Sequence, residues 1–242
     1  MMADVPRRCS GARRERRAAP RAGRPAYGQH DNQTTLLHAA HRVLSEDGAD
    51  AVSSERVCAV AGLPTTVFES VFADRTDCLI ALFDAAADGA QARMSAAYRS
   101  AETWVDAVRA ANFELLSLLD QNPRLARFMV LSLLSGGSPM LARRERLLGQ
   151  LAWALEAGRP PHAADASSAP FGAEALVGAV VAIIHSRLQE EPAPSLLELG
   201  GSLMAVLVLP YLGVEAARHE LSRPVPFVRA AHDAWQLSEP CR

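Results

Sequence analysis

The fold of this chain is decided by residues 34–83, which read TTLLHAAHRVLSEDGADAVSSERVCAVAGLPTTVFESVFADRTDCLIALF. The spacing of the apolar residues predicts three short helices and the start of a longer fourth helix. Gly48 suits the end of the first helix, where a left-handed residue is usual. The apolar stripe of that first helix consists of Leu36, Ala39, Ala40, Val43 and Leu44.

Residues 53–72 predict a helix-turn-helix. Ser53 or Ser54 caps the second helix, which carries Val57 and Cys58 inward. The turn is Gly62-Leu63-Pro64, and residues 65–72 predict a helix of only two turns. Such a pair of helices presents its second member to the major groove of DNA. Helical hairpins without a DNA-binding function share this spacing.

The residues of this stretch resemble those of TetR-type transcriptional regulators. Three later segments, NPRLARFMVLSLLSGGSP, EALVGAVVAIIHSRL and LVLPYLGVEAA, look like the second domain of such regulators, so the resemblance covers most of residues 34–217. It implies a homodimeric, ligand-responsive, one-component regulator, usually a repressor, that binds a pseudo-palindromic operator. The matching positions in the first stretch are Ala39-Ala40, Gly48, Ser53, Val57, Cys58, Ala61-Gly62, Leu63, Phe68, Phe72, Arg75 and 79–83.

The resemblance also indicates the residues that meet DNA. The start of the third helix is expected nearest the bases, with threonine hydroxyls donating to bases or phosphates. The second helix and the first residue of the fourth helix are expected to hold phosphates. The expected DNA-binding residues are Ser53, Ser54, Arg56, Leu63, Pro64, Thr65, Thr66, Val67 and Arg75.

Some residues depart from the family pattern. Pro64 stands where the family usually has serine, and Glu69 stands where a tyrosine commonly touches a phosphate. Residues 31–88 carry three arginines against ten acidic residues, a net charge of −7, which is unfavourable next to a polyanion. The alternative function is therefore a small-molecule-binding protein of the same fold whose DNA binding is weak or lost.

Residues 1–30 have the opposite charge. They hold eight arginines against Asp4 and Glu15, a net of +6, in a sequence of Arg, Gly, Pro and Ala without periodicity. A disordered basic arm in front of a DNA-binding unit favours contacts with phosphates or the minor groove. A passive leader is the alternative, so the sequence leaves open whether the arm binds DNA.

Composition and spacing predict an all-α protein, and the resemblance to TetR-type regulators implies four parts. These are a disordered Arg-rich arm (1–30), a DNA-binding domain (31–82), a helical ligand-binding and dimerisation domain (83–221) and a C-terminal tail (222–242). Asp74 is expected to cap the fourth helix together with Asp77. Residues 1–30 are expected to be disordered, with the DNA-binding unit beginning at about Asp31, and the ninth helix is expected to run from residue 195 to about residue 209.

The second domain is expected to carry two surfaces. Its last two helices are apolar nearly all round, which favours burial against a second subunit. Aromatic and methionine side chains on the fourth to seventh helices are usually plain core, but the resemblance implies a cavity there for an apolar or aromatic effector. The expected interface residues are Leu176, Val180, Ile184, Leu199, Leu203 and Val206, and the expected pocket residues are Met94, Trp104, Phe113, Phe128, Met129 and Trp153.

The sequence offers no support for catalysis or a cofactor. It has no nucleophile elbow, no paired metal motif and no phosphate loop, and its four cysteines are scattered without a C-x-x-C pair. Cys58 and Cys78 are expected to be small core residues, with a thiol redox sensor as the weaker alternative. The longest apolar stretch, residues 199–214, is shorter than the ~20 residues of a membrane helix, and no secretory h-region is present. A cytoplasmic protein without metal or cofactor is expected.

Overall fold

The computed structural model describes residues 27–135, 138–159, 172–190 and 194–226, and all regular structure among them is helical. The all-α prediction is thus confirmed. Two short 3₁₀ helices, η1 (Ala49–Ala51) and η2 (Leu196–Leu199), join the longer ones. The α-helices are α1 (Tyr27–Asp47), α2 (Ser54–Ala61), α3 (Thr65–Val71), α4 (Arg75–Arg99), α5 (Trp104–Gln121), α6 (Pro123–Ser135), α7 (Ser138–Ala157), α8 (Ala173–Leu188) and α9 (Gly200–Ser222).

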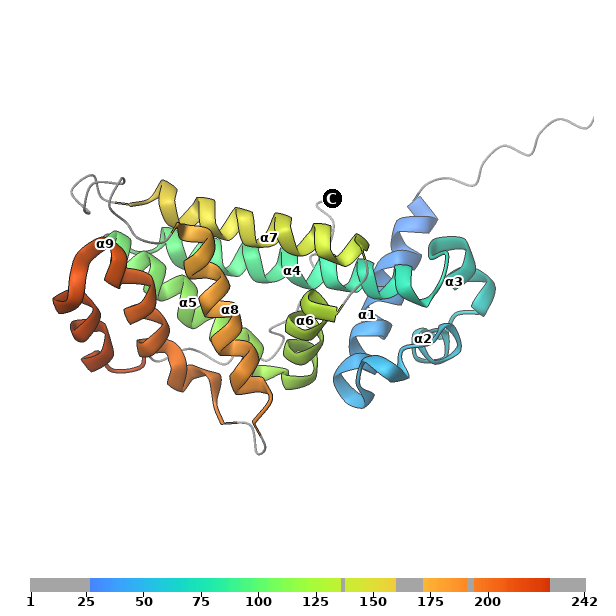
Figure 1. Cartoon of the computed structure of the whole chain (residues 1–242). Coiled ribbons are helices and arrows are strands. Elements are labelled where there is room, and N and C mark those ends of the chain that lie inside the picture. Colours follow the sequence, from blue (N-terminus) through green and yellow to red (C-terminus); the bar gives the residue numbers. More distant parts are fainter. Residues whose placement is uncertain (1–26, 136–137, 160–171, 191–193, 227–242) are drawn as a thin grey trace, which may run out of the picture.

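The helices form an elongated molecule with a small head and a larger body (Figure 1). We call α1 to α3 with the first half of α4 the head, and α5 and α7 to α9 with the second half of α4 the body. α4 runs from the head into the body, and α6 stands between the two (Figure 1). Two hydrophobic cores follow this division, one in the head and one in the body.

The head core extends past residue 82, where the sequence places a domain boundary. Phe83 of α4 and Leu125, Phe128 and Met129 of α6 are buried in it. The Asn122 side chain, which precedes α6, donates to Ser45 Oγ of α1 over 2.6 Å, and Arg124 donates to the Ser45 carbonyl over 3.2 Å. α6 therefore completes the head as well as contacting the body.

Side-chain caps set the starts of several helices. Asp74 accepts from the Asp77 amide at 2.8 Å, and the Asp77 carboxylate accepts from the Ala73 amide at 3.0 Å, so this predicted cap of α4 is confirmed. Ser53 Oγ accepts from the Arg56 amide at 3.2 Å and so caps α2.

Two predicted boundaries are wrong. α1 already begins at Tyr27, so residues 27–30 are helical, whereas residues 1–26 of the predicted arm lie outside the described residues. α9 continues to Ser222 instead of ending near residue 209, because Gly213, at φ +80°, reverses the chain and lets a second helical segment follow. That segment returns beside the start of α9, where Gly201 faces the backbone of Glu220 and Leu221 (Figure 1).

A buried ion pair fastens the returning segment to α5. Arg109 donates to Glu220 Oε2 at 2.7 Å, and their side chains are 6% and 1% exposed. The same guanidinium donates to the Pro224 carbonyl at 2.7 Å and lies 4.8 Å from the centre of the Phe113 ring. Arg223 joins the cluster through Glu220 and Asp106, each at 2.9 Å. Each charge in this cluster is therefore paired.

We expect Glu220→Leu to lower the free energy of unfolding by about 3 kcal/mol, because Arg109 would stay buried without its carboxylate. Urea denaturation at one protein concentration, followed by circular dichroism, measures this change. The matched control is Glu215→Leu, which removes the exposed ion pair with Arg218 and should change stability little. Equal losses in both variants would contradict the role of the buried pair.

Candidate nucleic-acid interface and ligand cavity

The turn between α2 and α3 depends on one glycine. Gly62 has φ +67°, and the amides of Gly62 and Leu63 both bond back to the Cys58 carbonyl. A residue with a side chain rarely adopts this left-handed conformation, so glycine is required here. Pro64 then precedes the first residue of α3 with extended dihedral angles. The predicted helix-turn-helix geometry is therefore present.

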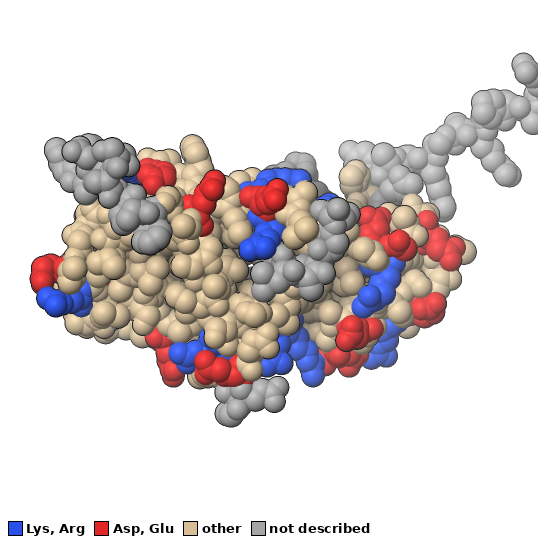
Figure 2. Space-filling model, in the orientation of Figure 1, with Lys and Arg blue, Asp and Glu red and all other residues tan. Residues whose placement is uncertain are grey.

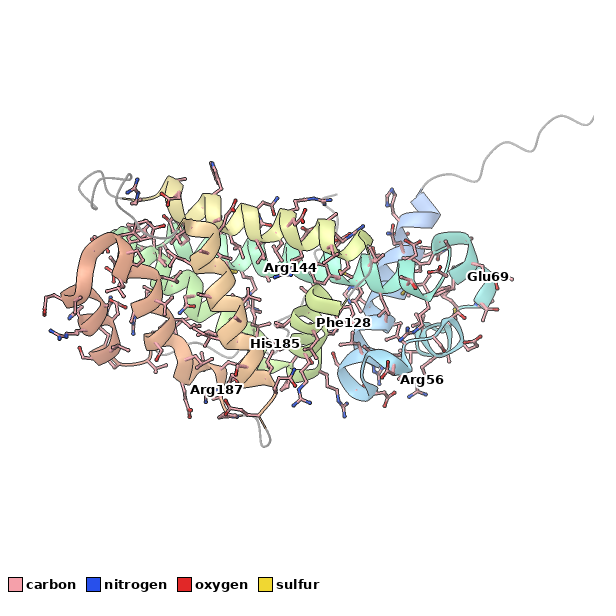
Figure 3. All side chains as sticks on the ribbon, viewed as in Figure 1. Arg56, Glu69, Phe128, Arg144, His185 and Arg187 are labelled. Carbon is pink, nitrogen blue, oxygen red and sulfur yellow. The ribbon has the colours of Figure 1, made fainter. Side chains whose placement is uncertain are left out.

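α3 has one face in the head core and one in solvent. Phe68 and Phe72 are buried with their ring centres 5.2 Å apart, and they anchor the helix. The opposite face exposes Thr65, Thr66 and Glu69. Figure 3 shows Glu69 at the outer end of the head, away from the body.

The nine expected DNA-binding residues differ in how far their side chains are exposed to solvent. Pro64, Thr65 and Thr66 are exposed, whereas Leu63 and Val67 are half-buried and pack on the head core. Ser53 and Ser54 are half-buried as well, and Ser53 is used as the cap of α2. The hydroxyls of α3 are therefore its most accessible hydrogen-bonding groups besides the carboxylate of Glu69.

Both expected arginines bind other parts of the head. Arg56 donates to Asp47 Oδ2 at 2.8 Å, and Arg75 donates to the carbonyls of Val52 at 2.6 Å and Ala49 at 2.8 Å. Arg75 thus holds η1 against the start of α4. The contact of Arg56 and Arg75 with DNA phosphates stays a prediction, because their side chains are 54% and 44% exposed. Spacing alone did not reveal that each also has a structural partner in the head.

Acidic side chains are prominent on the head. Figure 2 shows several red groups and few blue ones over its visible face, as the net charge of −7 for residues 31–88 requires. Cys58 and Cys78 lie buried beneath the helix-turn-helix, as expected for core residues. Burial raises the pKa of the Cys78 thiol to about 12, so this group stays protonated and unreactive at neutral pH.

A cavity of about 370 Å³ lies between α4, α5 and α7. Its α4 side carries Gln91, Met94, Ser95, Tyr98 and Arg99, which recur with helical spacing. Burial raises the pKa of the Tyr98 phenol, so its hydroxyl remains a donor at neutral pH. The residues from the other two helices are Ala111, Leu147, Gln150, Leu151, Trp153, Ala154, Ala157 and Gly158.

Four of the six expected pocket residues are core residues instead and do not line this cavity. Trp104 donates from Nε1 to the Leu155 carbonyl at 3.2 Å, and Phe113 lies under Arg109. Phe128 and Met129 belong to the head core. Only Met94 and Trp153 line the cavity, and Trp153 is 73% exposed at its rim. Helical spacing identifies apolar faces but does not distinguish a filled core from a hollow one.

The expected interface residues also need correction. Leu176, Val180, Ile184, Leu199 and Leu203 are buried within the single chain, and Val206 is half-buried. Besides Glu174 in the first turn of α8, these helices expose other apolar or small residues. They include Ala175, Ala182 and Ser186 of α8, and Leu209, Leu212 and Val214 of α9. Figure 2 shows a wide face without charged groups over α8 and its surroundings.

Two other features bear on whether this is a metal-binding or a membrane-spanning protein. Among the described residues, no group of three His, Cys, Asp or Glu side chains is placed to hold a metal ion. Residues 196–222 contain a stretch long and apolar enough to cross a membrane. However, Leu203 and Met204 are fully buried in the body core, and Glu220 is ion-paired, so this segment packs as a core helix.

Comparisons with known proteins agree with this architecture. No family model and no curated protein matches the chain. A solved structure of FadR from Bacillus subtilis in complex with stearoyl-CoA is 18% identical, with a TM-score of 0.57, over 74% of this chain and 98% of that one. RolR in complex with resorcinol is 20% identical, with a TM-score of 0.57, over 85% and 100%. A TetR family regulator from Marinobacter aquaeolei VT8 is 15% identical, with a TM-score of 0.53, over 78% and 97%. The chain has the fold of TetR-type transcriptional regulators.

Proposed function

We propose that this chain is a cytoplasmic, ligand-responsive transcriptional repressor that binds a pseudo-palindromic DNA operator as a homodimer and is not an enzyme. The observation that carries the proposal is the helix-turn-helix at the outer end of the head, which exposes Thr65 and Thr66 on a helix anchored from behind by Phe68. The structural neighbours are regulators, and two of them hold small molecules, which supports an effector.

α4 offers the mechanical link between effector and DNA. Leu82 and Phe83 fix its first half in the head core, and Met94 and Tyr98 line the cavity with its second half. Arg143 Nε of α7 donates to both carboxylate oxygens of Asp84 on α4, Oδ1 at 2.9 Å and Oδ2 at 2.8 Å. A ligand that separates α7 from α4 would shift the head, and it lowers DNA affinity if it binds the shifted state more tightly.

The exposed side of α8 and α9 supports dimerisation. α8 presents Ala175, Gly178 and Ala182 at helical spacing, and α9 presents Leu209 and Leu212. Small residues permit close approach of two backbones, and the face lacks charges that would need partners (Figure 2). Such a self-complementary face suits two copies related by a two-fold axis.

A second function is favoured by the electrostatics of the head. Its net charge of −7, with Arg56 and Arg75 already paired, suits a ligand-binding protein whose DNA affinity is weak or lost. If the chain is a DNA-binding repressor, the basic residues 1–26 compensate for the acidic head by binding DNA phosphates. If its DNA affinity is weak or lost, these residues do not bind DNA.

We expect the full chain to retard duplexes from the region upstream of its own gene in a mobility-shift assay. Removing residues 1–26 should flatten the slope of log affinity against log salt by roughly 0.9 for each phosphate that the segment neutralises. An unchanged slope would make the segment a passive leader. Full-length protein that is folded and dimeric but does not distinguish these duplexes from unrelated DNA would favour the second function.

We expect Ala182→Arg and Leu209→Arg to give folded monomers, because each places a charge on the proposed interface. Light scattering reports the mass, and circular dichroism reports the fold. Ala92→Arg, on an exposed position of α4, is the matched control and should leave the dimer intact. Leu203→Arg should instead unfold the chain, since Leu203 is fully buried in its own subunit. Dimers in both interface variants would refute this interface.

We expect a neutral aromatic compound such as 2-naphthol to quench Trp153 fluorescence and release bound DNA, because the cavity walls are largely apolar. Ala154→Phe, which fills the cavity, should weaken binding by about tenfold or more, whereas Ala142→Phe on the same helix should not. Release of DNA only by phosphorylated metabolites would contradict the proposed ligand class.

A further inference from the structure

Glu69 is an unneutralised carboxylate on the outer face of α3. It is exposed, and among the described residues no hydrogen bond or ion pair engages its side chain. The two head arginines that could approach it are held elsewhere, Arg56 by Asp47 and Arg75 by backbone carbonyls. The Glu69 carboxylate therefore stabilises no other part of the head through a hydrogen bond or an ion pair.

The position shares its face with the predicted base-contacting residues. Thr65 and Glu69 are four residues apart on α3 and therefore lie on the same side of the helix. Phe68 and Phe72 face the core, and the Ser70 hydroxyl donates to the Val67 carbonyl at 2.7 Å. The outward hydrogen-bonding side chains of α3 are thus Thr65, Thr66 and Glu69, and neither Arg, Asn nor Gln is among the residues of this helix.

The chemistry of this face limits what it recognises. A phosphate repels Glu69, and so do the keto oxygens of thymine and guanine, which are acceptors at the edge of the major groove. The amino groups of cytosine and adenine are donors there, but adenine places the acceptor N7 beside its amino group, so cytosine is the usual partner of a glutamate. A carboxylate on a head that is already acidic therefore lowers affinity for DNA in general and gains a partner only at the correct base.

We propose that Glu69 is a specificity-determining residue that accepts a hydrogen bond from the amino group of a cytosine in each half-site of the operator. This inference rests on the proposed function, since it requires α3 to enter the major groove. It assigns cytosine to one position of each operator half-site. Glu69 then selects by repulsion from the wrong bases as much as by attraction to the correct one.

The test is selection of bound sequences from a pool of randomised duplexes with the full chain, Glu69→Gln and Glu55→Gln. Glu55 is exposed at the start of α2, so the last variant removes the same charge from the neighbouring helix. We expect the wild-type motif to contain an invariant cytosine in each half-site. Glu69→Gln should replace it by adenine, which glutamine reads, while Glu55→Gln keeps the wild-type motif.

A second measurement changes only the DNA and so does not depend on the folding of a variant. Wild-type protein should bind a duplex with 2-pyrimidinone opposite guanine at that position about tenfold or more weakly than the cytosine duplex. 2-Pyrimidinone is cytosine without its amino group, so the guanine opposite and its major-groove acceptors stay the same.

The outcomes separate the two proposals. If Glu69→Gln selects the unchanged motif with uniformly tighter binding, Glu69 is only a repelling charge, and this inference is wrong while the regulator stands. Equal affinity for the cytosine and 2-pyrimidinone duplexes would overturn it in the same way. If the folded wild-type dimer selects no motif at all, both the inference and the proposed DNA-binding function fail.

Discussion

α4 and α6 belong to two hydrophobic cores at once, and this sharing constrains the whole molecule. α4 buries Leu82 and Phe83 in the head and continues into the body, while α6 gives Leu125 and Phe128 to the head and Ala126 and Val130 to the body. Close-packed interiors tolerate little sliding, so neither helix moves without a response from both cores. The head is therefore held by the body through α4 and α6, and Met140 of α7 is buried in the head core as a third attachment. Any change of shape in the body that displaces one helix relative to the other must tilt the head.

Much of this architecture follows from local sequence signals. Gly62, the caps at Ser53 and Asp74, and the prolines after Asn122 and Ser138 place the helix ends within a residue or two, because each acts through backbone geometry of its own segment. The error at the end of α9 had a non-local cause. Gly213 allows the chain to reverse after an apolar helix, but the return segment is held by Arg109, more than a hundred residues earlier in the chain.

The surfaces were less predictable than the helices. Apolar periodicity correctly placed Leu176 and Leu203 inward, but it did not show that their own subunit covers them. The cavity residues of α4 do recur at helical spacing, yet a stripe of Gln91, Met94 and Tyr98 looks like an ordinary amphipathic face. Whether such a face borders a void depends on the side chains of two other helices. No pattern within one helix contains that information.

The reversal at Gly213 has a consequence for how the protein is made. The body core needs Tyr211 and Ala217, and the charge of Arg109 is paired only when Glu220 arrives. Residues on α5 are therefore synthesised long before the partners that cover them. During translation, α5 and α8 present apolar surface and an uncompensated arginine until Glu220 and Pro224 have left the ribosome. A nonsense mutation anywhere before codon 220 would leave that state permanent, which makes the truncated product a substrate for chaperones and proteases rather than a folded protein lacking only its last helix.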